Sequence, residues 1–314
     1  MTRLNDRLRT SLDKTLGQLT ADASSAANMG ELCALLCDLR GSSTETEWSA
    51  VKATCRSHPL FEVIQEDPLS RRIYEKPRGY AGDARMMDLI YKSEHPKEIN
   101  DIGRCVYDFI TARPCARGAR ARKMMLSELL HETIEGCDSP EILSVACGHM
   151  RETQLLSSNR LNRAGRIVAF DQDEASLAEV SRSMSDCEVL SLVPGSIRRL
   201  IAGRHDLGTF DLIYSLGLYD YLEQPIAQQL TRVLFDALKP GGRLVIANFL
   251  PIEASGFMEA FLEWNLIYRT QREIMDMAAG LDEEAISSKR YSEDHTKTIG
   301  FIELSKAQAN AAAA

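Results

Sequence analysis

The chain has 314 residues, of which 44% are hydrophobic and 26% are charged, and its formal net charge is −8. This composition is ordinary for a globular protein, and the acidic balance argues against nucleic acid as a partner. The sequence has no apolar run of about 18 residues, which a membrane span would need, and its polar N-terminus has no secretory signal. The eight cysteines include no C-x-x-C pair. They indicate reduced thiols in a cytoplasmic protein rather than a disulfide framework.

The first part of the chain, 1–125, carries helical signals and no convincing strand. Leucines recur at spacings of three and four over residues 4–19, which predicts an amphipathic helix. This helix either packs on its own chain or forms a homodimer interface. Further helices are expected near 101–112 and over 115–135. We therefore expect an all-helical N-terminal cap, or lid.

After Gly136 the pattern changes to short apolar runs separated by polar, helix-length segments. Such an alternation is typical of a doubly wound, Rossmann-like α/β sheet that is mostly parallel. The expected strands are 141–147, 166–171, 187–195, 210–217 and 242–249.

The remaining residues complete the predicted core. We expect a helix at 256–279 and two more strands near 285–290 and 298–304, the last of them antiparallel. The core then covers 126–305, and 306–314 form a frayed tail without a core signal.

In an open α/β sheet, ligands bind at the carboxyl ends of the strands, beside the point where the strand order reverses. The first predicted strand and its turn are ILSVACGHMRE, residues 142–152. Ala146 and Gly148 are small enough for a ligand to approach the backbone. His149 and Met150 would hinder a pyrophosphate, so the turn argues against a dinucleotide.

Asp171 closes the second predicted strand. A carboxylate there can accept hydrogen bonds from both ribose hydroxyls of an adenosine, or it can cap the next helix. Ser196 follows the third strand, where it can contact an adenine or cap a helix. His149 is either a structural or stacking residue or a base. The other candidates for cofactor binding are Cys147, Glu152, Gln172 and Ser215.

The order of these elements over 141–250 resembles the class I S-adenosylmethionine-dependent methyltransferases. A turn such as Lys239-Pro240-Gly241-Gly242 before a strand is the most frequent turn motif of that class. The resemblance implies S-adenosylmethionine as the cofactor. The acidic residue usual on the first strand is Ser144 here, so Glu152 or a backbone carbonyl would contact the amino group of the cofactor.

Four segments resemble a narrower bacterial subgroup, the extracellular-factor (3-hydroxypalmitic acid methyl ester) biosynthesis methyltransferases. The segments are PRGYAGDARMMDLIY (77–91), SVACGHMRE (144–152), GLYDYL (217–222) and FLEWNLIYRT (261–270). The resemblance implies a helical cap over a methyltransferase core, and it does not fix the substrate. We expect a small carboxylate-containing metabolite as the acceptor. The acceptor is either a hydroxy fatty acid carboxylate or an amino acid methylated on sulfur or nitrogen.

Candidate acceptor-binding residues lie in the glycine-punctuated loop of the cap. Arg78 can hold a carboxylate through two hydrogen bonds, and Tyr80 can cover the adenosyl group or the acceptor. Asp83 is a third candidate. The alternatives are a surface arginine, a packed tyrosine and a helix N-cap.

Other acceptor candidates follow the fourth and fifth strands. Tyr219, Asp220 and Tyr221 are the candidate catalytic residues, because phenol oxygens can orient a nucleophile or a methyl group; one tyrosine is alternatively core. Asn248 ends the fifth strand, either at the acceptor or in a turn. Arg269 is a second candidate carboxylate anchor, or a partner in an ordinary ion pair.

The sequence also leaves rival interpretations. Histidines show no metal-ligand spacing, so no metal is expected. The basic residues of 113–123 form a solvated helix face or contact a phosphopantetheine group or carrier protein. Two other functions are alternatives to a small-molecule methyltransferase. One is a regulatory protein that binds the cofactor without turnover, and the other is a nucleic-acid methyltransferase.

Overall fold

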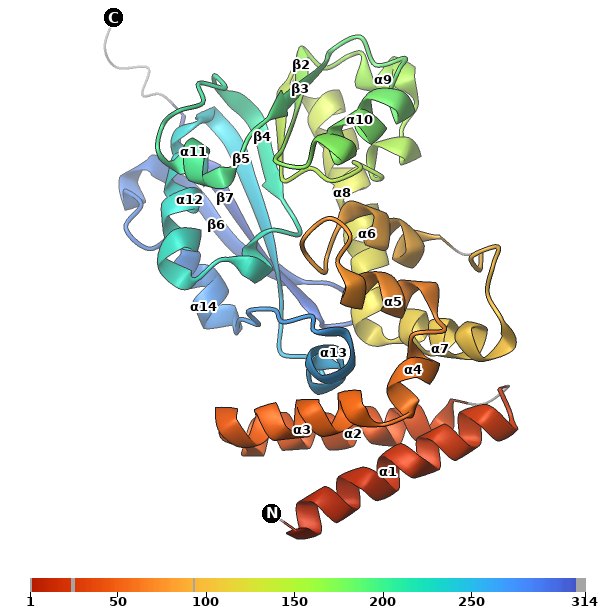
Figure 1. The fold of residues 1–314 in the computed structure, drawn as a ribbon. Helices are drawn as coiled ribbons and strands as arrows, with labels where there is room; N and C mark the ends of the chain where they lie inside the picture. The colour runs from red at the N-terminus through yellow and green to blue at the C-terminus, as the bar shows by residue number, and fades with distance from the viewer. Residues whose placement is uncertain (1, 24–25, 93, 309–314) are drawn as a thin grey trace, which may run out of the picture. The chain divides into compact units, whose positions relative to one another are not determined.

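The structure is a computed structural model (Figure 1). It describes residues 2–23, 26–92 and 94–308. Contacts divide the chain into two compact units. The helical unit consists of residues 1–120 and 251–265, and the sheet unit consists of residues 121–250 and 266–314. The sequence predicts 251–265 as part of the core, whereas the structure places this segment in the helical unit. Within the described ranges, no helix is long and apolar enough to cross a bilayer.

Several helices of the helical unit begin at a residue whose side chain caps them. Its helices are α1 (Thr2–Ala21), α2 (Ala27–Ser42), α3 (Glu45–Ser57), α4 (Leu60–Ile64), α5 (Pro68–Glu75), α6 (Ala84–Tyr91), α7 (Asp101–Ala112), α13 (Ser255–Leu262) and the first part of α8 (Pro114–Gly136). Thr44 and Glu47 form a reciprocal capping box at α3. Asp67 caps α5, with Pro68 at its first position. The predicted helices at 101–112 and 115–135 are confirmed as α7 and α8.

Helix α13 is held in the helical unit by contacts with residues about 200 positions earlier in the chain. The Trp48 indole Nε1 donates to Glu259 Oε2 over 2.7 Å, inside the core of the unit. Arg40 Nε lies 3.0 Å from the same carboxylate oxygen. A Cβ on Gly256 would lie 2.3 Å from the carbonyl oxygen of Leu36, so only glycine permits this approach to α2. Local sequence patterns do not reveal such long-range partners.

The described residues of the second unit form one seven-stranded sheet with the order β3-β2-β1-β4-β5-β7-β6. The strands are β1 (Glu141–Val145), β2 (Arg166–Asp171), β3 (Leu190–Pro194), β4 (Phe210–Ser215), β5 (Leu238–Phe249), β6 (Ile286–Glu293) and β7 (Ile299–Lys306). Strands β1 to β5 pair in parallel, and β7 is antiparallel to β5 and β6. The predicted doubly wound sheet with an antiparallel last strand is confirmed. The order reverses between β1 and β4.

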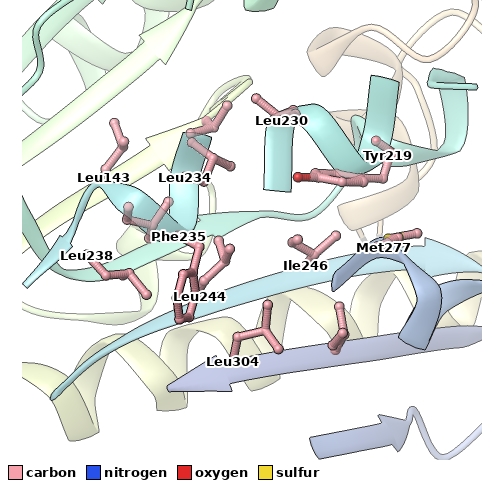
Figure 2. Packing of buried hydrophobic residues seen from close by; sticks show 14 of the residues in the cluster. Leu143, Tyr219, Leu230, Leu234, Phe235, Leu238, Leu244, Ile246, Met277 and Leu304 are labelled. Atoms are coloured by element: carbon pink, nitrogen blue, oxygen red, sulfur yellow. The ribbon is translucent and has the colours of Figure 1, made fainter. Parts of the chain in front are cut away.

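Alternating strand residues face an apolar layer on one side of the sheet. The helices of this unit are α9 (Ser158–Leu161), α10 (Glu174–Ser183), α11 (Ile197–Ile201), α12 (Gln224–Asp236), α14 (Gln271–Met275), the short η1 (Thr153–Leu155), η2 (Tyr219–Tyr221), η3 (Asp276–Ala278) and η4 (Glu283–Ala285), and the rest of α8. Figure 2 shows side chains of α12 and η3 packed against those of β1, β5 and β7. The labelled members of this cluster are Leu143, Tyr219, Leu230, Leu234, Phe235, Leu238, Leu244, Ile246, Met277 and Leu304.

The helix predicted over 256–279 is two helices separated by an extended segment. Helix α13 ends at Leu262 because Glu263 adopts a left-handed conformation with φ of 48°. The segment then pairs with the edge of the sheet: the Ile267 amide donates to Asp220 O, and the Arg269 amide to Phe249 O. A capping box of Thr270 and Glu273 starts α14. Tertiary pairing therefore overrides the helical pattern here.

Two smaller predictions concern the ends of β5 and of the chain. The turn predicted at Lys239-Pro240-Gly241-Gly242, before the strand, lies inside β5, where the pairing with β4 shifts register between Phe210 and Leu212. Lys306, the first residue of the predicted tail, ends β7. Residues 309–314 lie outside the described residues.

Gly256→Ala tests the packing of α13. Since the new Cβ would meet the Leu36 carbonyl, we expect the free energy of unfolding to fall by about 1–3 kcal/mol. Gly30→Ala in α2 is the matched control. Its Cβ would meet no atom within 4 Å, so helix propensity should raise stability by about 0.5–1 kcal/mol. Urea unfolding followed by circular dichroism measures both; equal effects would contradict the close approach.

Candidate cofactor site

The turn after β1 holds three left-handed residues at alternate positions. The φ angles are 53° at Ala146, 55° at Gly148 and 47° at Met150. A left-handed conformation costs a non-glycine residue about 1–2 kcal/mol. The turn is tied to β2, since the Cys147 amide donates to Phe170 O over 3.2 Å. Backbone strain of this kind gathers at ligand-binding sites.

Asp171 ends β2 beside this turn. Its Oδ2 accepts a hydrogen bond from the Gly148 amide, and its Oδ1 from the Asp173 amide, each over 2.8 Å. Burial raises the pKa of the Asp171 carboxyl, and hydrogen bonding to the amides of Asp173, Gly148 and Gln172 opposes this effect. Asp173, not Asp171, caps α10 by accepting from the Ala175 amide. A carboxylate has about four lone-pair sites, so Asp171 keeps acceptor capacity for a ligand.

Glu152 lies at the same end of the sheet, on the side of β4. The Tyr214 hydroxyl donates to Glu152 Oε1 over 2.9 Å. Burial raises the pKa of the Glu152 carboxyl, while this bond and the positive charge of Arg122 oppose the rise. Tyr214 pairs with Ser144 across β1 and β4. An acidic side chain is thus present near Ser144, although it comes from the loop that follows β1.

The other predicted cofactor residues differ in their freedom to bind a ligand. The Ser215 hydroxyl donates to Val145 O over 3.0 Å and so ties β4 to β1. Burial and the charges of Asp171 and Glu152 raise the pKa of the Cys147 thiol far above its usual value, which keeps it a neutral thiol. His149 is buried, with Nδ1 3.4 Å from an Arg151 guanidinium nitrogen.

Two predicted residues mark the neighbouring strand ends. Gln172 is exposed after β2. Ser196 occupies the N-cap position of α11, yet its hydroxyl forms no capping hydrogen bond. The capping alternative for Ser196 is therefore absent from this structure, and its hydroxyl remains a candidate contact for an adenine.

Arg269 and Asn248 form a buried network with backbone carbonyls. Arg269 is 2% exposed, and it donates from Nε to Gln224 Oε1 and from Nη1 to Asn248 Oδ1 and Tyr219 O. Its Nη2 donates to Leu222 O. The Asn248 amide nitrogen donates to two carbonyl oxygens, those of Phe249 and Ile267. These bonds make both side chains part of the support of the sheet edge, and their contact with an acceptor stays a prediction.

The residues after β4 also separate into different roles. Tyr219 is fully buried, and its hydroxyl lies 3.1 Å from Thr231 Oγ1 in the apolar layer (Figure 2), which assigns it to the core. Asp220 is buried, and its Oδ1 accepts from the Phe249 amide over 2.7 Å. Burial raises the pKa of the Asp220 carboxyl to about 6. Tyr221 is 38% exposed and stays a candidate.

The candidates of the cap loop lie between α5 and α6 in the helical unit. Asp83 caps α6 through the Met86 amide over 2.8 Å. Arg72 also donates to both of its carboxylate oxygens. Asp83 is thus the predicted N-cap, and its carboxylate is fully engaged. Arg78 and Tyr80 stay candidates from sequence.

Sequence reasoning missed the role of Arg122. The basic residues of 113–123 were expected on a solvated helix face, yet Arg122 is 6% exposed and donates from Nη1 to Leu216 O. Its guanidinium carbon lies 6.0 Å from the centre of the Phe249 ring. The spacing of Arg122 from Ala119 and Leu126 could have indicated its burial, because all three lie on the same buried face of α8.

Comparisons with known proteins agree with this geometry. Residues 142–242 match the methyltransferase domain family. None of the curated proteins matches the chain. A possible exported protein from Bordetella parapertussis shares the fold, with 20% identity and a TM-score of 0.65, over 92% of this chain and 97% of its own.

Two similar structures are methyltransferases. The N-methyltransferase NodS from Bradyrhizobium japonicum WM9 is 13% identical over 60% of this chain and 97% of its own, with a TM-score of 0.43. Magnesium protoporphyrin IX methyltransferase from Synechocystis PCC 6803 is 12% identical over 75% of this chain and 97% of its own, with a TM-score of 0.49.

The family match and the strand order define a class I S-adenosylmethionine-dependent methyltransferase domain. They support S-adenosylmethionine as the cofactor. The residues at the carboxyl ends of β1 and β2 fit an adenosine, because the buried Asp171 carboxylate keeps acceptor capacity beside a turn built on the small residues Ala146 and Gly148.

Ala146→Gly tests the strain in the turn. Glycine adopts positive φ without steric cost, so we expect the free energy of unfolding to rise by about 0.5–1 kcal/mol. Ala227→Gly inside α12 is the control and should lower stability by about 1 kcal/mol or more. Both are measured by urea unfolding; destabilisation by Ala146→Gly would refute the left-handed geometry.

Asp220 should make stability depend on pH. Because its pKa is raised to about 6, the folded state binds a proton that the unfolded state, with a pKa of about 3.9, has already released. Stability due to this group is therefore highest at low pH and is lost as pH rises from about 4 to 6. Asp220→Asn should remove this component, on the order of 1–3 kcal/mol, from the pH profile of unfolding. Parallel profiles for the two proteins would contradict it.

Proposed function

We infer that this protein transfers the methyl group of S-adenosylmethionine to a small, carboxylate-containing acceptor. The observation that carries the proposal is the position of Asp171, a buried carboxylate at the end of β2 that holds the turn after β1. The methyltransferase family match over 142–242 supports the same reaction class.

When bound, the cofactor would supply an electrophilic methyl group on a sulfonium: a lone pair of the acceptor would attack the methyl carbon in line, and the thioether S-adenosylhomocysteine would leave with the electron pair of the broken carbon–sulfur bond. The chain's own residues then serve to bind and orient. Asp171 accepts hydrogen bonds from ribose hydroxyls, and the turn at Gly148 lets the nucleoside approach the backbone. Such positioning makes the reaction effectively unimolecular, which is the main contribution a site without an essential acid or base can make.

The nature of the acceptor rests on sequence. The resemblance to the extracellular-factor biosynthesis subgroup leaves two acceptors equally open, a hydroxy fatty acid carboxylate and an amino acid methylated on sulfur or nitrogen. Since Arg269 already donates to two side-chain amides and two backbone carbonyl oxygens, we propose Arg78 as the carboxylate anchor. Tyr80 and Tyr221 remain the proposed aromatic contacts. The cytoplasmic location and a homodimer through the N-terminal helices likewise remain proposals.

Asp171→Asn tests the binding of the cofactor. An amide is a weaker acceptor than a carboxylate, so we expect the Kd for S-adenosylhomocysteine to rise at least tenfold, about 1.4 kcal/mol. Asp173→Asn is the matched control. Asparagine also caps helices, so this variant should bind almost as the wild type does. Isothermal titration calorimetry measures both, and an unchanged Kd for Asp171→Asn would refute the proposed ribose contact.

Turnover separates an enzyme from a cofactor-binding regulator. The wild-type protein is incubated with S-adenosylmethionine and pooled small metabolites, and mass spectrometry follows S-adenosylhomocysteine and methylated products. A transferase forms both in equal amounts. Tight binding without any product would favour the regulator.

A further inference from the structure

The turn after β1 is held on one flank by Asp171, and a second acidic residue holds its other flank. Arg151 directly follows Met150, the last left-handed residue of the turn. The Nη2 of Arg151 donates to Glu179 Oε1 over 2.6 Å. Glu179 lies in the middle of α10, the helix that follows β2. Both flanks of the turn are therefore tied to one stretch of chain, the end of β2 and α10.

The pair of Arg151 and Glu179 is shielded from water. Both side chains are 16% exposed, so solvent and salt screen their attraction less than they screen a surface ion pair. Burial opposes the charged form of Glu179, but its hydrogen bonds with Arg151 and Arg182 outweigh this effect and lower the pKa of its carboxyl. The contact with Arg151 is thus a charge-assisted hydrogen bond, which is stronger than a neutral one.

Arg151 also reaches back into the turn. The same Nη2 lies 3.4 Å from Nδ1 of His149, a side chain that is 4% exposed. A guanidinium carries donors alone, so Nδ1 faces it as an acceptor and the ring proton lies on Nε2. A hydrogen bond at one ring nitrogen in this way fixes the tautomer and the orientation of the ring. The ion pair therefore orders a side chain inside the turn.

The backbone of the same flank is held by Thr153. Its hydroxyl donates to Met150 O over 2.7 Å and lies 3.3 Å from Met184 Sδ, at the C-cap of α10. Met150 has a φ of 47°, which costs about 1–2 kcal/mol for a residue with a side chain. Contacts from outside the turn must offset this cost, and on this flank they come from the loop that carries Arg151 and from α10.

The other arginine on the same carboxylate has a different environment. Arg182 donates to Glu179 Oε2, and its side chain is 75% exposed. It belongs to α10 itself, three residues further along the helix, so its bond is local. The two oxygens of Glu179 thus serve one contact within the helix and one contact with the turn. This division separates a role in the turn from a role in the helix.

We propose that Arg151 and Glu179 are positioning residues that hold the turn after β1 in the conformation that binds the nucleoside. The inference rests on the proposed function, because it takes S-adenosylmethionine as the ligand of this turn. The two residues act through His149 and the turn backbone. When the pair is broken, the turn samples other conformations, and the apparent Kd rises in proportion to the lost fraction of competent molecules.

The test is isothermal titration calorimetry with S-adenosylhomocysteine. We expect Arg151→Met and Glu179→Gln each to raise the Kd at least about fivefold. Arg151→Lys keeps a charge and a donor and recovers part of the loss. Arg182→Gln is the matched control, because it removes the bond to the other oxygen of the same carboxylate, and it changes the Kd less than about twofold.

A double variant shows whether the two residues act as one pair. Arg151→Met combined with Glu179→Gln should bind no more weakly than Arg151→Met alone, because the first substitution has already broken the contact. Nitrogen-15 NMR of the His149 ring gives an independent signature. We expect the tautomer protonated on Nε2 in the wild type and a mixture of tautomers in Arg151→Met.

The stoichiometry of the same titrations separates positioning from a purely structural role. Loss of a structural contact lowers the fraction of folded protein, so the number of sites falls while the folded molecules keep their Kd. Loss of a positioning contact raises the Kd at full stoichiometry.

A wild-type Kd in Arg151→Met and Glu179→Gln, additive effects in the double variant, or a ring proton on Nδ1 in the wild type overturns the inference while the proposed function stands. A wild-type protein that does not bind S-adenosylhomocysteine overturns the proposed function, and the inference with it.

Discussion

The hydrogen bond from the Gly148 amide to the Asp171 carboxylate joins the turn after β1 to the end of β2. It couples two features that each cost free energy: a buried carboxylate whose pKa is raised by burial, and a turn that holds Ala146 and Met150 in left-handed conformations. Each offsets part of the other's cost, because the turn gives the carboxylate a donor and the carboxylate fixes the turn. The rest of the proposed nucleoside site is placed relative to this pair.

The other half of the sheet edge depends on a second set of polar contacts. Asp220 accepts a hydrogen bond from the Phe249 amide through its side chain and one from the Ile267 amide through its carbonyl oxygen. Arg269 donates to the carbonyl oxygen of Tyr219 in η2. Asp220 and Arg269 are buried, and an unpaired polar group is costly in a low dielectric. Each side chain is accordingly paired through hydrogen bonds. They fix the end of β4, and with it the positions of Tyr214 and Leu216, on which Glu152 and Arg122 depend.

The sequence predicted the sheet well because its signals are local. Short apolar runs between polar helices indicate buried parallel strands, and β2 coincides with its predicted bounds at 166–171. It also predicted Asp171 at a strand end and Asp83 as a helix cap. It failed where distant residues decide. Hydrogen bonds to Asp220 and Phe249 break the helix predicted at 256–279, and Trp48 draws α13 into the helical unit. The charge of Arg122 predicts a solvent-exposed side chain, whereas its position on the buried face of α8 indicates a buried one.

The helical unit is assembled from two stretches of chain, one that precedes strands β1 to β5 in the sequence and one that follows them. The contact of Arg40 with Glu259 spans 219 residues. During synthesis on the ribosome, the N-terminal helices therefore emerge long before the segment that completes their core. Until α13 is synthesised, the apolar surface that it covers stays exposed on these helices. Aggregation and binding to chaperones compete with folding during this time. The closure of this long loop, rather than any local helix, should set the pace at which the newly made chain matures.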